Sequence, residues 1–526
     1  MNRTPTFYCL FFLVVLAALL FRVSGLGLRP MHHDEANQAV KFGSLLEEGK
    51  YRYDPTQHHG PSLYYLTLPF AWIGSGTSFA SLNEVVLRLV PAVFGAGIIL
   101  LLLLLKDGYS PPALFFSGIL TAVSPVMVYY SRFYIQEILL VFFLVGAIAS
   151  GWRYFREHRW GWAAAAGFFS GMMFATKETC ILLFGAAAGS LILVRVLGGS
   201  VKSSENPQSK EKNPRRATLL HLLVFGGTAV AVSILFFSSF FQNPRGILDS
   251  VLAFKTYFGR AAGAGFHTHP FLYYLKMLAF SHYGNGPVWS EALVLILALV
   301  GCTSVFLNRS QKMSERLFLR FVFFFTVLAT AIYSLIPYKT PWNILPFYIG
   351  VILLAGQGVY FLLTASRKII VQSLVILILG GGLYHLGLQS YRANFTYSAD
   401  PRNPYVYAQT SPDFLNLVQR VKDIARFHPE HKQMLIKVIT YPDEAWPLPW
   451  YLRSFRKVGY WQEVEEAGPL SDVPLIISST DKVDRLQLHI RDNYQSEYYG
   501  LRPEVLLALH IRKDLWDKFI EERSLK

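Results

Sequence analysis

The sequence predicts an α-helical polytopic membrane protein with a small α/β domain at its C-terminal end, and three observations support this. Of the 526 residues, 52% are hydrophobic and only 16% are charged, a balance typical of chains that lie largely in a bilayer. Eleven apolar runs each have about the 20 residues needed to cross a hydrocarbon core. The part after residue 390 is more polar and contains strand-like runs.

The apolar runs predict about eleven transmembrane helices, with ends placed to within a few residues. The first run follows Arg3 and is not followed by a small-residue cleavage site, so we expect an uncleaved first span. The runs lie near residues 7–28, 83–105, 111–130, 133–152, 160–176, 179–198, 218–241, 286–307, 317–337, 341–364 and 369–390.

Basic residues gather in alternate loops, as expected for loops that stay on the cytoplasmic side. Gly198–Asn213 is rich in Ser, Lys, Glu and Asn and is predicted to be a cytoplasmic linker. This orientation predicts an integral protein of the cell membrane whose other loops and tail are extracytoplasmic. The residues that set it are Arg153, Arg156, Arg159, Lys202, Lys210, Lys212, Arg215, Arg216, Arg309, Lys312, Arg316, Arg367 and Lys368.

Two domains follow from this pattern. Residues 1–390 are the predicted transmembrane domain, with outer loops 29–82 and 242–285, and the apolar stretch 61–73 is too short to span, which favours an interfacial or re-entrant helix. Residues 391–526 are the predicted extracytoplasmic α/β domain, because MLIKVIT (434–440) and VPLIISS (473–479) look like strands and 413–426 looks helical.

Charge and cysteine usage exclude some functions. The net charge of +15 could suggest nucleic acid, but its placement in alternate loops is better explained by membrane topology, so we expect no nucleic-acid partner. Cys9, Cys180 and Cys302 each lie inside an apolar run. Neither a disulfide framework nor a thiolate metal site is therefore indicated.

An adjacent acid pair, Asp34 and Glu35, follows the first span in the sequence MHHDEA. A carboxylate at a membrane surface can be partly desolvated, which suits removal of a proton from an acceptor hydroxyl. Asp34 is the candidate catalytic base, with Glu35 beside it. The alternative is that the pair caps a helix beginning near Ala36, where the helix dipole favours negative charge.

Cations lie at the outer ends of several predicted spans, where charge near hydrocarbon is costly and often functional. They suit the phosphate of a lipid whose tail stays in the bilayer. Snorkelling towards the headgroups is the alternative, and it explains Arg88 least well because an apolar run follows at once. The cations are Arg88, Arg132, Lys177 and Lys339, and their polar neighbours are Tyr134, Glu137 and Glu178.

Histidines form a second set in the predicted outer loops. Histidine with Asp or Glu can bind a divalent metal, but no spacing here matches a known ligand motif, so hydrogen bonding to sugar or phosphate stays open beside metal binding. These histidines are His32, His33, His58, His59, His267 and His269.

Taken together, these motifs resemble a known group of enzymes. MHHDEA, the HGP and YY elements within YDPTQHHGPSLYYL (53–66) and LRLVPAVFG (87–95) are similar to the polyprenyl-phosphate-sugar-dependent transferases, meaning the protein O-mannosyltransferases and the aminoarabinose transferase ArnT. With PYKTPWN (337–343) and DEAWPLPWYLR (443–453), the chain most resembles the Agl-type, flippase-associated branch of the glycosyltransferase C superfamily.

The resemblance implies a glycosyltransferase C fold and an inverting, single-displacement transfer from a dolichyl- or undecaprenyl-phosphate sugar on the outer surface. It makes Asp34 the base, Glu35 its partner and Arg88 the arginine facing the lipid phosphate, and it matches Glu137 and Lys177 to further site positions. Arg and Lys can neutralise the leaving phosphate, so no cofactor is required, although a divalent metal is possible. The chain has HGP rather than HPP and lacks the mannosyltransferases' large insert, which leaves the acceptor open as a glycan, a lipid or a protein.

Three other functions compete with this interpretation. One is an oligosaccharyl or polymer transferase that uses a lipid pyrophosphate, which a strict metal requirement would favour. Another is a flippase or transporter of lipid-linked sugars, but spans such as 89–105 and 284–307 carry almost no charge apart from Glu291. The third is a non-catalytic scaffold, against which the presence of Asp34, Glu35 and Arg88 argues.

Overall fold

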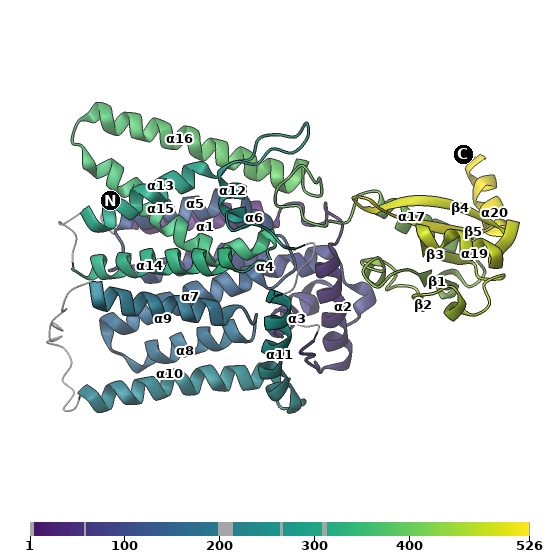
Figure 1. Ribbon diagram of the computed structural model, residues 1–526, viewed down its shortest axis with the longest axis horizontal. Coiled ribbons are helices and arrows are strands. Elements are labelled where there is room, and N and C mark those ends of the chain that lie inside the picture. The colour runs from purple at the N-terminus through teal and green to yellow at the C-terminus, as the bar shows by residue number, and fades with distance from the viewer. Residues whose placement is uncertain (1–4, 57–58, 198–213, 263–266, 308–312, 525–526) are drawn as a thin grey trace. The chain divides into compact units, whose positions relative to one another are not determined.

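The computed structural model describes residues 5–56, 59–197, 214–262, 267–307 and 313–524 (Figure 1). The predicted linker Gly198–Asn213 with Lys202, Lys210 and Lys212 lies outside these residues, and so do His58, Arg309 and Lys312.

A helix lies at each of the eleven predicted apolar runs. By length and composition, eight helical segments in the described ranges can cross a membrane, whereas α5 and α13 are shorter apolar helices and α8 has 15 residues. The chain is an integral membrane protein. The helices are α1 (Pro5–Val23), α4 (Glu84–Leu101), α5 (Pro111–Val123), α7 (Glu137–Glu157), α8 (Trp160–Phe174), α9 (Cys180–Leu197), α10 (Pro214–Phe237), α13 (Ala292–Leu307), α14 (Met313–Leu335), α15 (Leu345–Ala365) and α16 (Ile369–Tyr391).

The predicted run 111–130 is divided into two helices. Helix α5 ends at Val123, and the short α6 (Pro125–Tyr130) begins at once, with Ser124 as its N-cap and Pro125 as its first residue. Proline cannot donate the backbone hydrogen bond that would continue α5, and it is well tolerated in a first turn. The break places Tyr129 and Tyr130 at the end of α6 and Arg132 in the turn between α6 and α7.

Helix α15 forms the centre of the bundle, since every residue from Leu345 to Val359 is buried. It packs very closely on α13, where a Cβ added to Gly301 would meet the Leu354 carbonyl oxygen at 1.9 Å, and one added to Gly358 would meet that of Leu297 at 2.0 Å. Only glycine permits this approach of two backbones.

Glu291 is fully buried where α13 begins. Its carboxylate accepts hydrogen bonds from Ser124 Oγ at 2.7 Å, from the Val126 backbone N–H at 2.9 Å and from Tyr348 OH at 2.6 Å. A buried acid is tolerated when its oxygens are satisfied in this way. Glu291 therefore joins α13, α15 and the first turn of α6. It is the one charged residue in 284–307, and this structural role explains its presence there without a transport path.

The described residues also form shorter helices, among them α2 (His33–Glu48), α3 (Ser62–Gly74), α11 (Arg245–Ala262) and α12 (Tyr273–Ala279). Helix α3 covers the stretch predicted to be interfacial or re-entrant. Helix α11 lies across the direction of α10 (Figure 1), and it exposes apolar side chains while Asp249 and Ser250 on its other face are buried. The exposed side chains are Ile247, Leu248, Val251 and Leu252. Such reversed amphipathicity suits a helix at a lipid surface.

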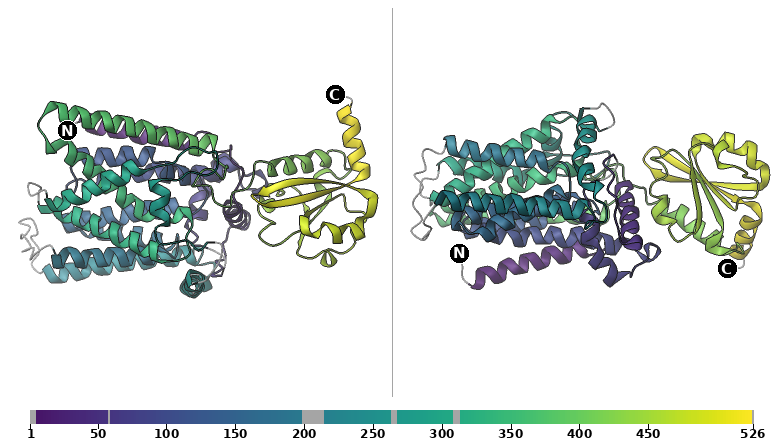
Figure 2. Two further views of the ribbon diagram at one scale, coloured as in Figure 1. Left: turned by 45° about the horizontal axis from the view of Figure 1, so that its top comes forward. Right: turned by 90° about the horizontal axis from the view of Figure 1, so that it is seen from below.

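The C-terminal region is the predicted α/β domain. A five-stranded sheet has the order β2-β1-β3-β5-β4, with β1 parallel to β2 and β3, and β5 antiparallel to β3 and β4 (Figure 2). The two predicted strands are β1 (Leu435–Ile439) and β3 (Leu475–Ser479). The others are β2 (Lys457–Trp461), β4 (Tyr494–Arg502) and β5 (Val505–Arg512), and the helices are α17 (Phe414–Ala425), α18 (Leu448–Tyr451), α19 (Val483–Ile490) and α20 (Lys513–Ser524).

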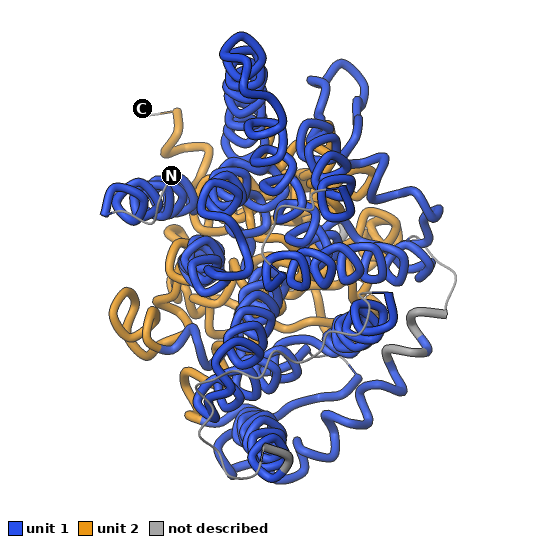
Figure 3. Tube along the Cα trace, turned by 90° about the vertical axis from the view of Figure 1, so that its left-hand side faces the viewer, with its two compact units in different colours: residues 1–26, 50–68, 88–396 blue, residues 27–49, 69–87, 397–526 orange. Residues whose placement is uncertain are grey.

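The chain forms two compact units, and neither is continuous in sequence (Figure 3). The first comprises residues 1–26, 50–68 and 88–396, and the second comprises 27–49, 69–87 and 397–526. The division expected from the sequence was a single cut after residue 390. By contacts, two parts of the predicted loop 29–82, including α2, belong with the C-terminal domain.

Candidate active site

Helix α2 begins with a capping box. His32 is the N-cap, and its Nδ1 accepts the backbone N–H of Asp34 at 3.0 Å, while the Glu35 carboxylate accepts the backbone N–H of His32 at 3.1 Å. This arrangement satisfies two backbone donors that a helix start leaves without partners. The expected helix start near Ala36 was therefore wrong, because the helix begins at His33 and takes both acids into its first turn.

The two adjacent acids have different surroundings. Glu35 is fully buried, and besides closing the capping box it lies 3.7 Å from Arg29. The side chain of Asp34 is 43% exposed and lies 3.8 Å from His32 Nδ1. Glu35 is thus a structural residue, whereas the carboxylate of Asp34 takes no part in the capping box and is open to solvent. Of the two acids, only Asp34 has a side chain that solvent can reach.

The segment that leads into α2 is held by the C-terminal region of the same unit. Hydrogen bonds connect it to residues 375–420 positions away in sequence. They join Met31 N to Tyr451 OH at 2.9 Å, Gln409 Nε2 to the Pro30 oxygen at 2.9 Å, Thr410 Oγ1 to the Met31 oxygen at 2.7 Å, and His32 Nε2 to the Tyr407 oxygen at 2.9 Å. We call the four C-terminal partners, Tyr407, Gln409, Thr410 and Tyr451, the α2 clamp. These contacts could not be foreseen from the sequence, since each of the C-terminal partners is an ordinary polar residue.

In the first unit, Lys177 and Glu137 form a buried ion pair. Lys177 Nζ lies 2.5 Å from Glu137 Oε1 and 3.3 Å from Asn343 Oδ1, and both charged side chains are less than 8% exposed. The second carboxylate oxygen, Oε2 of Glu137, is buried and accepts no hydrogen bond from the described residues. Burial of a carboxylate oxygen without a hydrogen-bond donor is costly.

Glu178, the neighbour of Lys177, holds a second polar cluster. Its carboxylate accepts hydrogen bonds from Tyr53 OH at 3.0 Å and contacts His59 Nδ1 at 2.9 Å. Gly60, which follows His59, packs so tightly against the Ala175 carbonyl that an added Cβ would lie 2.3 Å from the carbonyl oxygen. The HGP element is thereby fixed against the turn that carries Lys177 and Glu178.

The predicted phosphate-binding arginines hold helix ends together. Arg88 is 1% exposed and donates to the Leu26 oxygen at 2.7 Å. Arg132 lies over the Phe395 ring at 4.7 Å, and its guanidinium donates to four carbonyl oxygens at the end of α1, those of Phe21, Arg22, Ser24 and Gly25, at 2.5–3.2 Å. Orphan carbonyls at a helix C-terminus favour such a cation.

Arg22 is a polar residue that sequence reasoning missed. It is fully buried inside the first apolar run and donates to the oxygens of Thr121 and Ala122 at the end of α5, at 2.8 and 3.2 Å. A lone arginine near the end of an apolar run was the available signal. These hydrogen bonds show that Arg22 joins the end of α1 to the end of α5.

The remaining predicted site residues are spread over the loops of the first unit. Tyr134 OH pairs with Thr67 Oγ1 at 2.9 Å. Lys339 Nζ donates to the oxygens of His269 and Ile336 at 3.0 and 2.5 Å, and the His267 ring lies against Tyr338, with 4.8 Å between ring centroids. Within the described ranges, no three or more His, Cys, Asp or Glu side chains are placed to hold a metal ion.

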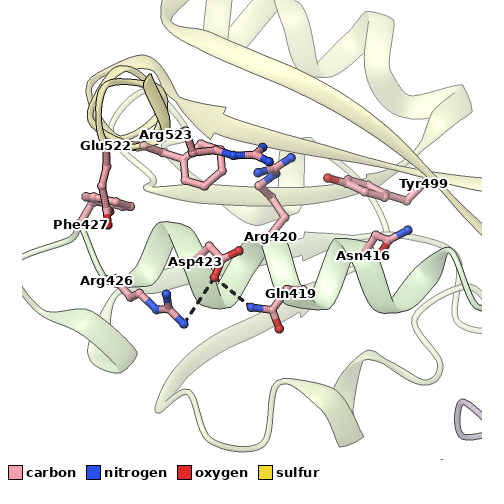
Figure 4. A pocket seen from close by; sticks show the side chains of 10 residues that line it. Asn416, Gln419, Arg420, Asp423, Arg426, Phe427, Tyr499, Glu522 and Arg523 are labelled. Atoms are coloured by element: carbon pink, nitrogen blue, oxygen red, sulfur yellow. Dashed lines mark hydrogen bonds and ion pairs between the residues drawn. The ribbon is translucent and has the colours of Figure 1, made fainter. Parts of the chain in front are cut away.

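A cavity of about 560 Å³ lies in the second unit between α17, β4 and α20 (Figure 4). None of its lining residues is a predicted site residue. Its charges are largely compensated, since Arg420 pairs with Glu497 at 2.7 Å and Asp423 contacts Arg426 at 3.6 Å. The lining residues are Asn416, Gln419, Arg420, Asp423, Arg426, Phe427, Tyr499, Phe519, Glu522 and Arg523.

Comparison with known proteins gives a family match and a fold. Residues 67–205 match the family model of dolichyl-phosphate-mannose-protein mannosyltransferases. ArnT from Cupriavidus metallidurans bound to undecaprenyl phosphate is similar in structure, with a TM-score of 0.61 and 14% identity over 96% of this chain and 98% of that one.

The oligosaccharyltransferase AglB from Archaeoglobus fulgidus, in complex with an inhibitory peptide and a dolichol-phosphate, gives a TM-score of 0.57 and 12% identity over 94% of this chain and 74% of that one. No curated protein matches the chain. At these identities the likeness is one of fold, and it covers nearly the whole chain.

Proposed function

We propose that this chain, which has the glycosyltransferase C fold, transfers a sugar from a polyprenyl-phosphate-linked donor to an acceptor hydroxyl. The observation that carries the proposal is the division of tasks between the adjacent acids: Glu35 closes the capping box, and Asp34 presents a partly exposed carboxylate from a rigid first turn. The similar fold of ArnT with bound undecaprenyl phosphate supports a donor of this class.

In the proposed reaction the acceptor oxygen attacks the anomeric carbon of the donor while its proton passes to Asp34. The bond between the anomeric carbon and the phosphate oxygen breaks, and its electron pair leaves with the polyprenyl phosphate. Displacement in one step inverts the configuration of the anomeric carbon. The protein's part is to orient the hydroxyl, take its proton and offset the charge growing on the phosphate.

Lys177 is the best-supported cation for offsetting the charge that grows on the phosphate. It is buried, so its charge acts in a poorly solvated environment, and its partner Glu137 keeps one oxygen without a hydrogen bond from the described residues. In the resting protein Glu137 neutralises Lys177. When a phosphate arrives, Lys177 can share its donors between the two anions, as ammonium groups with three N–H bonds do. Arg88 and Lys339 are proposed to assist, and no metal is needed.

We place the tail and Asp34 on the extracytoplasmic side of the cell membrane, on the strength of the basic residues in the alternate loops. A membrane-impermeant thiol reagent tests this in a background without the native cysteines. A cysteine at the exposed Glu504 should be labelled on intact cells, and one at Lys210 only after lysis. Labelling of both on intact cells contradicts the orientation.

Activity is tested with the purified chain in nanodiscs. Undecaprenyl- and dolichyl-phosphate mannose and glucose are supplied with a membrane extract from cells lacking the gene, and mass spectrometry follows donor loss and any newly glycosylated product. Lipid-phosphate release that depends on Asp34 supports the proposal. The fold shared with AglB favours one second candidate, an oligosaccharyl transferase that uses a lipid pyrophosphate, and activity that requires both such a donor and a divalent metal would select it.

A further inference from the structure

The α2 clamp makes the start of α2 and the C-terminal domain one body, so the surroundings of Asp34 within the second unit include residues far along the chain. Trp446, from DEAWPLPW, lies against His33, with 5.7 Å between ring centroids and 37° between ring planes. His33 directly precedes Asp34. The residue beside Asp34 in α2 therefore contacts the C-terminal domain.

An exposed ion pair lies in the same neighbourhood. Arg502, in the last position of β4, donates to the carboxylate of Asp443 at 2.7 Å and to its backbone oxygen at 3.2 Å, and the Asp443 side chain is 67% exposed. Burial lowers the pKa of His33, and the charges of Asp34, Arg502 and Asp443 all act on that ring. The indole therefore lies against the first residue of α2, and the charges of the ion pair lie near enough to act on that residue.

These side chains have the chemistry of carbohydrate recognition. The indole offers a flat apolar face to the C–H side of a sugar ring. A carboxylate accepts hydrogen bonds, a guanidinium donates them in pairs, and a neutral imidazole does one of each, which suits neighbouring hydroxyl groups. A hydrocarbon tail would remove water from both charges without offering them a hydrogen bond.

We infer that His33, Trp446, Asp443 and Arg502 form an acceptor subsite for a saccharide, whose hydroxyl they present to Asp34. The inference rests on the proposed transfer reaction and adds the class of acceptor to it. Trp446 carries the sugar ring, the Asp443–Arg502 pair fixes its hydroxyls, and His33 joins that pair to the base. The bonds made and broken are those of the proposed reaction, with a sugar hydroxyl as the nucleophile.

Saturation-transfer NMR on the full chain in nanodiscs tests this directly. The probes are maltotriose, mannotriose and triacetylchitotriose, with the peptide acetyl-Ala-Thr-Ala-amide for comparison. At least one saccharide should bind, and Trp446→Ala and Asp443→Asn should each weaken its binding about tenfold, as expected for loss of an aromatic anchor or a charged partner. Asp443 is exposed, so Asp443→Asn keeps the test valid if Trp446→Ala misfolds.

Matched controls exist in the same domain. Trp516 is a partly exposed tryptophan on α20, and Asp514 forms an ion pair with Arg512 at 2.6 Å like that of Asp443 with Arg502. Trp516→Ala and Asp514→Asn should leave binding unchanged. Failure of every saccharide to bind, binding unaffected by Trp446→Ala and Asp443→Asn, or binding of the peptide in their place would overturn the subsite.

The outcome is separable from that of the proposed function. If saccharide binding requires Trp446 but sugar transfer does not depend on Asp34, the subsite is supported and the proposed reaction is contradicted. If transfer depends on Asp34 but is unchanged by Trp446→Ala and Asp443→Asn, the proposed reaction is supported and the subsite is contradicted.

Discussion

The carboxylate of Glu35 accepts the backbone N–H of His32 at 3.1 Å, and this bond assigns the capping of α2 to Glu35 and His32 rather than to Asp34. Sequence alone left Asp34 with two roles, base or cap. The structure gives the cap to its neighbours. As an acid in the first turn, Asp34 still benefits from the general preference of a helix N-terminus for negative charge, which is worth about 0.3–1 kcal/mol at an exposed position.

The first prediction separates these neighbours by stability. Glu35→Ala removes one half of the capping box and the partner of Arg29, so the free energy of unfolding should fall by about 1 kcal/mol or more. Asp34→Ala should cost less than half as much. Thermal unfolding of both variants in the same detergent measures the difference, and an equal or larger loss for Asp34→Ala would return the capping role to Asp34.

The second prediction concerns the Lys177–Glu137 pair. Lys177→Met removes the proposed charge-assisted contact to the lipid phosphate, so binding of undecaprenyl phosphate should weaken about tenfold to a hundredfold. Glu137→Gln removes the competing anion while keeping the shape of the side chain, so binding should be unchanged or tighter. Binding is measured with the purified variants in nanodiscs.

Lys276 is the control for this comparison, because it is also a lysine of the first unit but lies on α12 outside the buried cluster. Lys276→Met should bind the lipid phosphate as the parent protein does. If Glu137→Gln weakened binding as much as Lys177→Met, the pair would act as a structural unit and Lys177 would lose its assigned role.

The third prediction tests the α2 clamp. Tyr451→Phe leaves the buried Met31 N–H without its acceptor at a cost of about 1–3 kcal/mol, and it loosens the segment that positions Asp34. Turnover should fall while binding of undecaprenyl phosphate is kept, because the lipid site lies on other residues. Tyr498→Phe, at an exposed tyrosine of the same domain, should change neither quantity, and reduced lipid binding by Tyr451→Phe would contradict the positioning role.

The fourth prediction is a pH dependence of stability in the C-terminal domain. His510 on β5 is fully buried between Ser478 and Ser496, and burial lowers its pKa to about 4. The unfolded chain, with a histidine pKa near 6.5, binds more protons between these values. Above about pH 6.5 the protonation of His510 therefore does not lower the free energy of unfolding. As the pH drops towards 4, that free energy falls by up to about 3 kcal/mol.

Thermal unfolding at pH 7 and pH 4.5 measures this effect. His510→Gln should be less stable at pH 7 but lose less on acidification than the parent protein. His489→Gln, at an exposed histidine of α19, should lose as much as the parent. An undiminished acid loss in His510→Gln would remove His510 as its source.

Much of the fold was predictable because hydrophobicity sets it. Every predicted apolar run corresponds to a helix, and the two predicted strands, β1 and β3, are inner strands of the sheet with largely buried residues. Strands β2, β4 and β5 were not predicted. Strands β2 and β4 mix polar and apolar residues on partly exposed faces, whereas β5 is largely apolar and buried but was overlooked. The start of α2 was misplaced by three residues, since a histidine N-cap lies outside the usual capping residues.

The site was less predictable, because it depends on contacts distant in sequence. The sequence drew attention to Lys177, Glu137, Glu178 and His59, and the structure joins them in two pairs. It could not show that Arg132 donates to the end of α1, since an arginine at a span end looks the same whether it binds a lipid phosphate or a helix terminus. The α2 clamp was equally hidden, because nothing in Gln409 or Thr410 indicates a partner near residue 30.

The central claim, that Asp34 is the catalytic base, is tested most directly by Asp34→Asn. Asparagine keeps the size and the hydrogen-bonding capacity of the side chain but cannot take a proton, and Glu35 still closes the capping box. The variant should therefore fold, bind undecaprenyl phosphate as the parent does, and transfer sugar about a hundredfold to ten-thousandfold more slowly. Transfer by Asp34→Asn at close to the parent rate, with donor binding intact, would contradict the account.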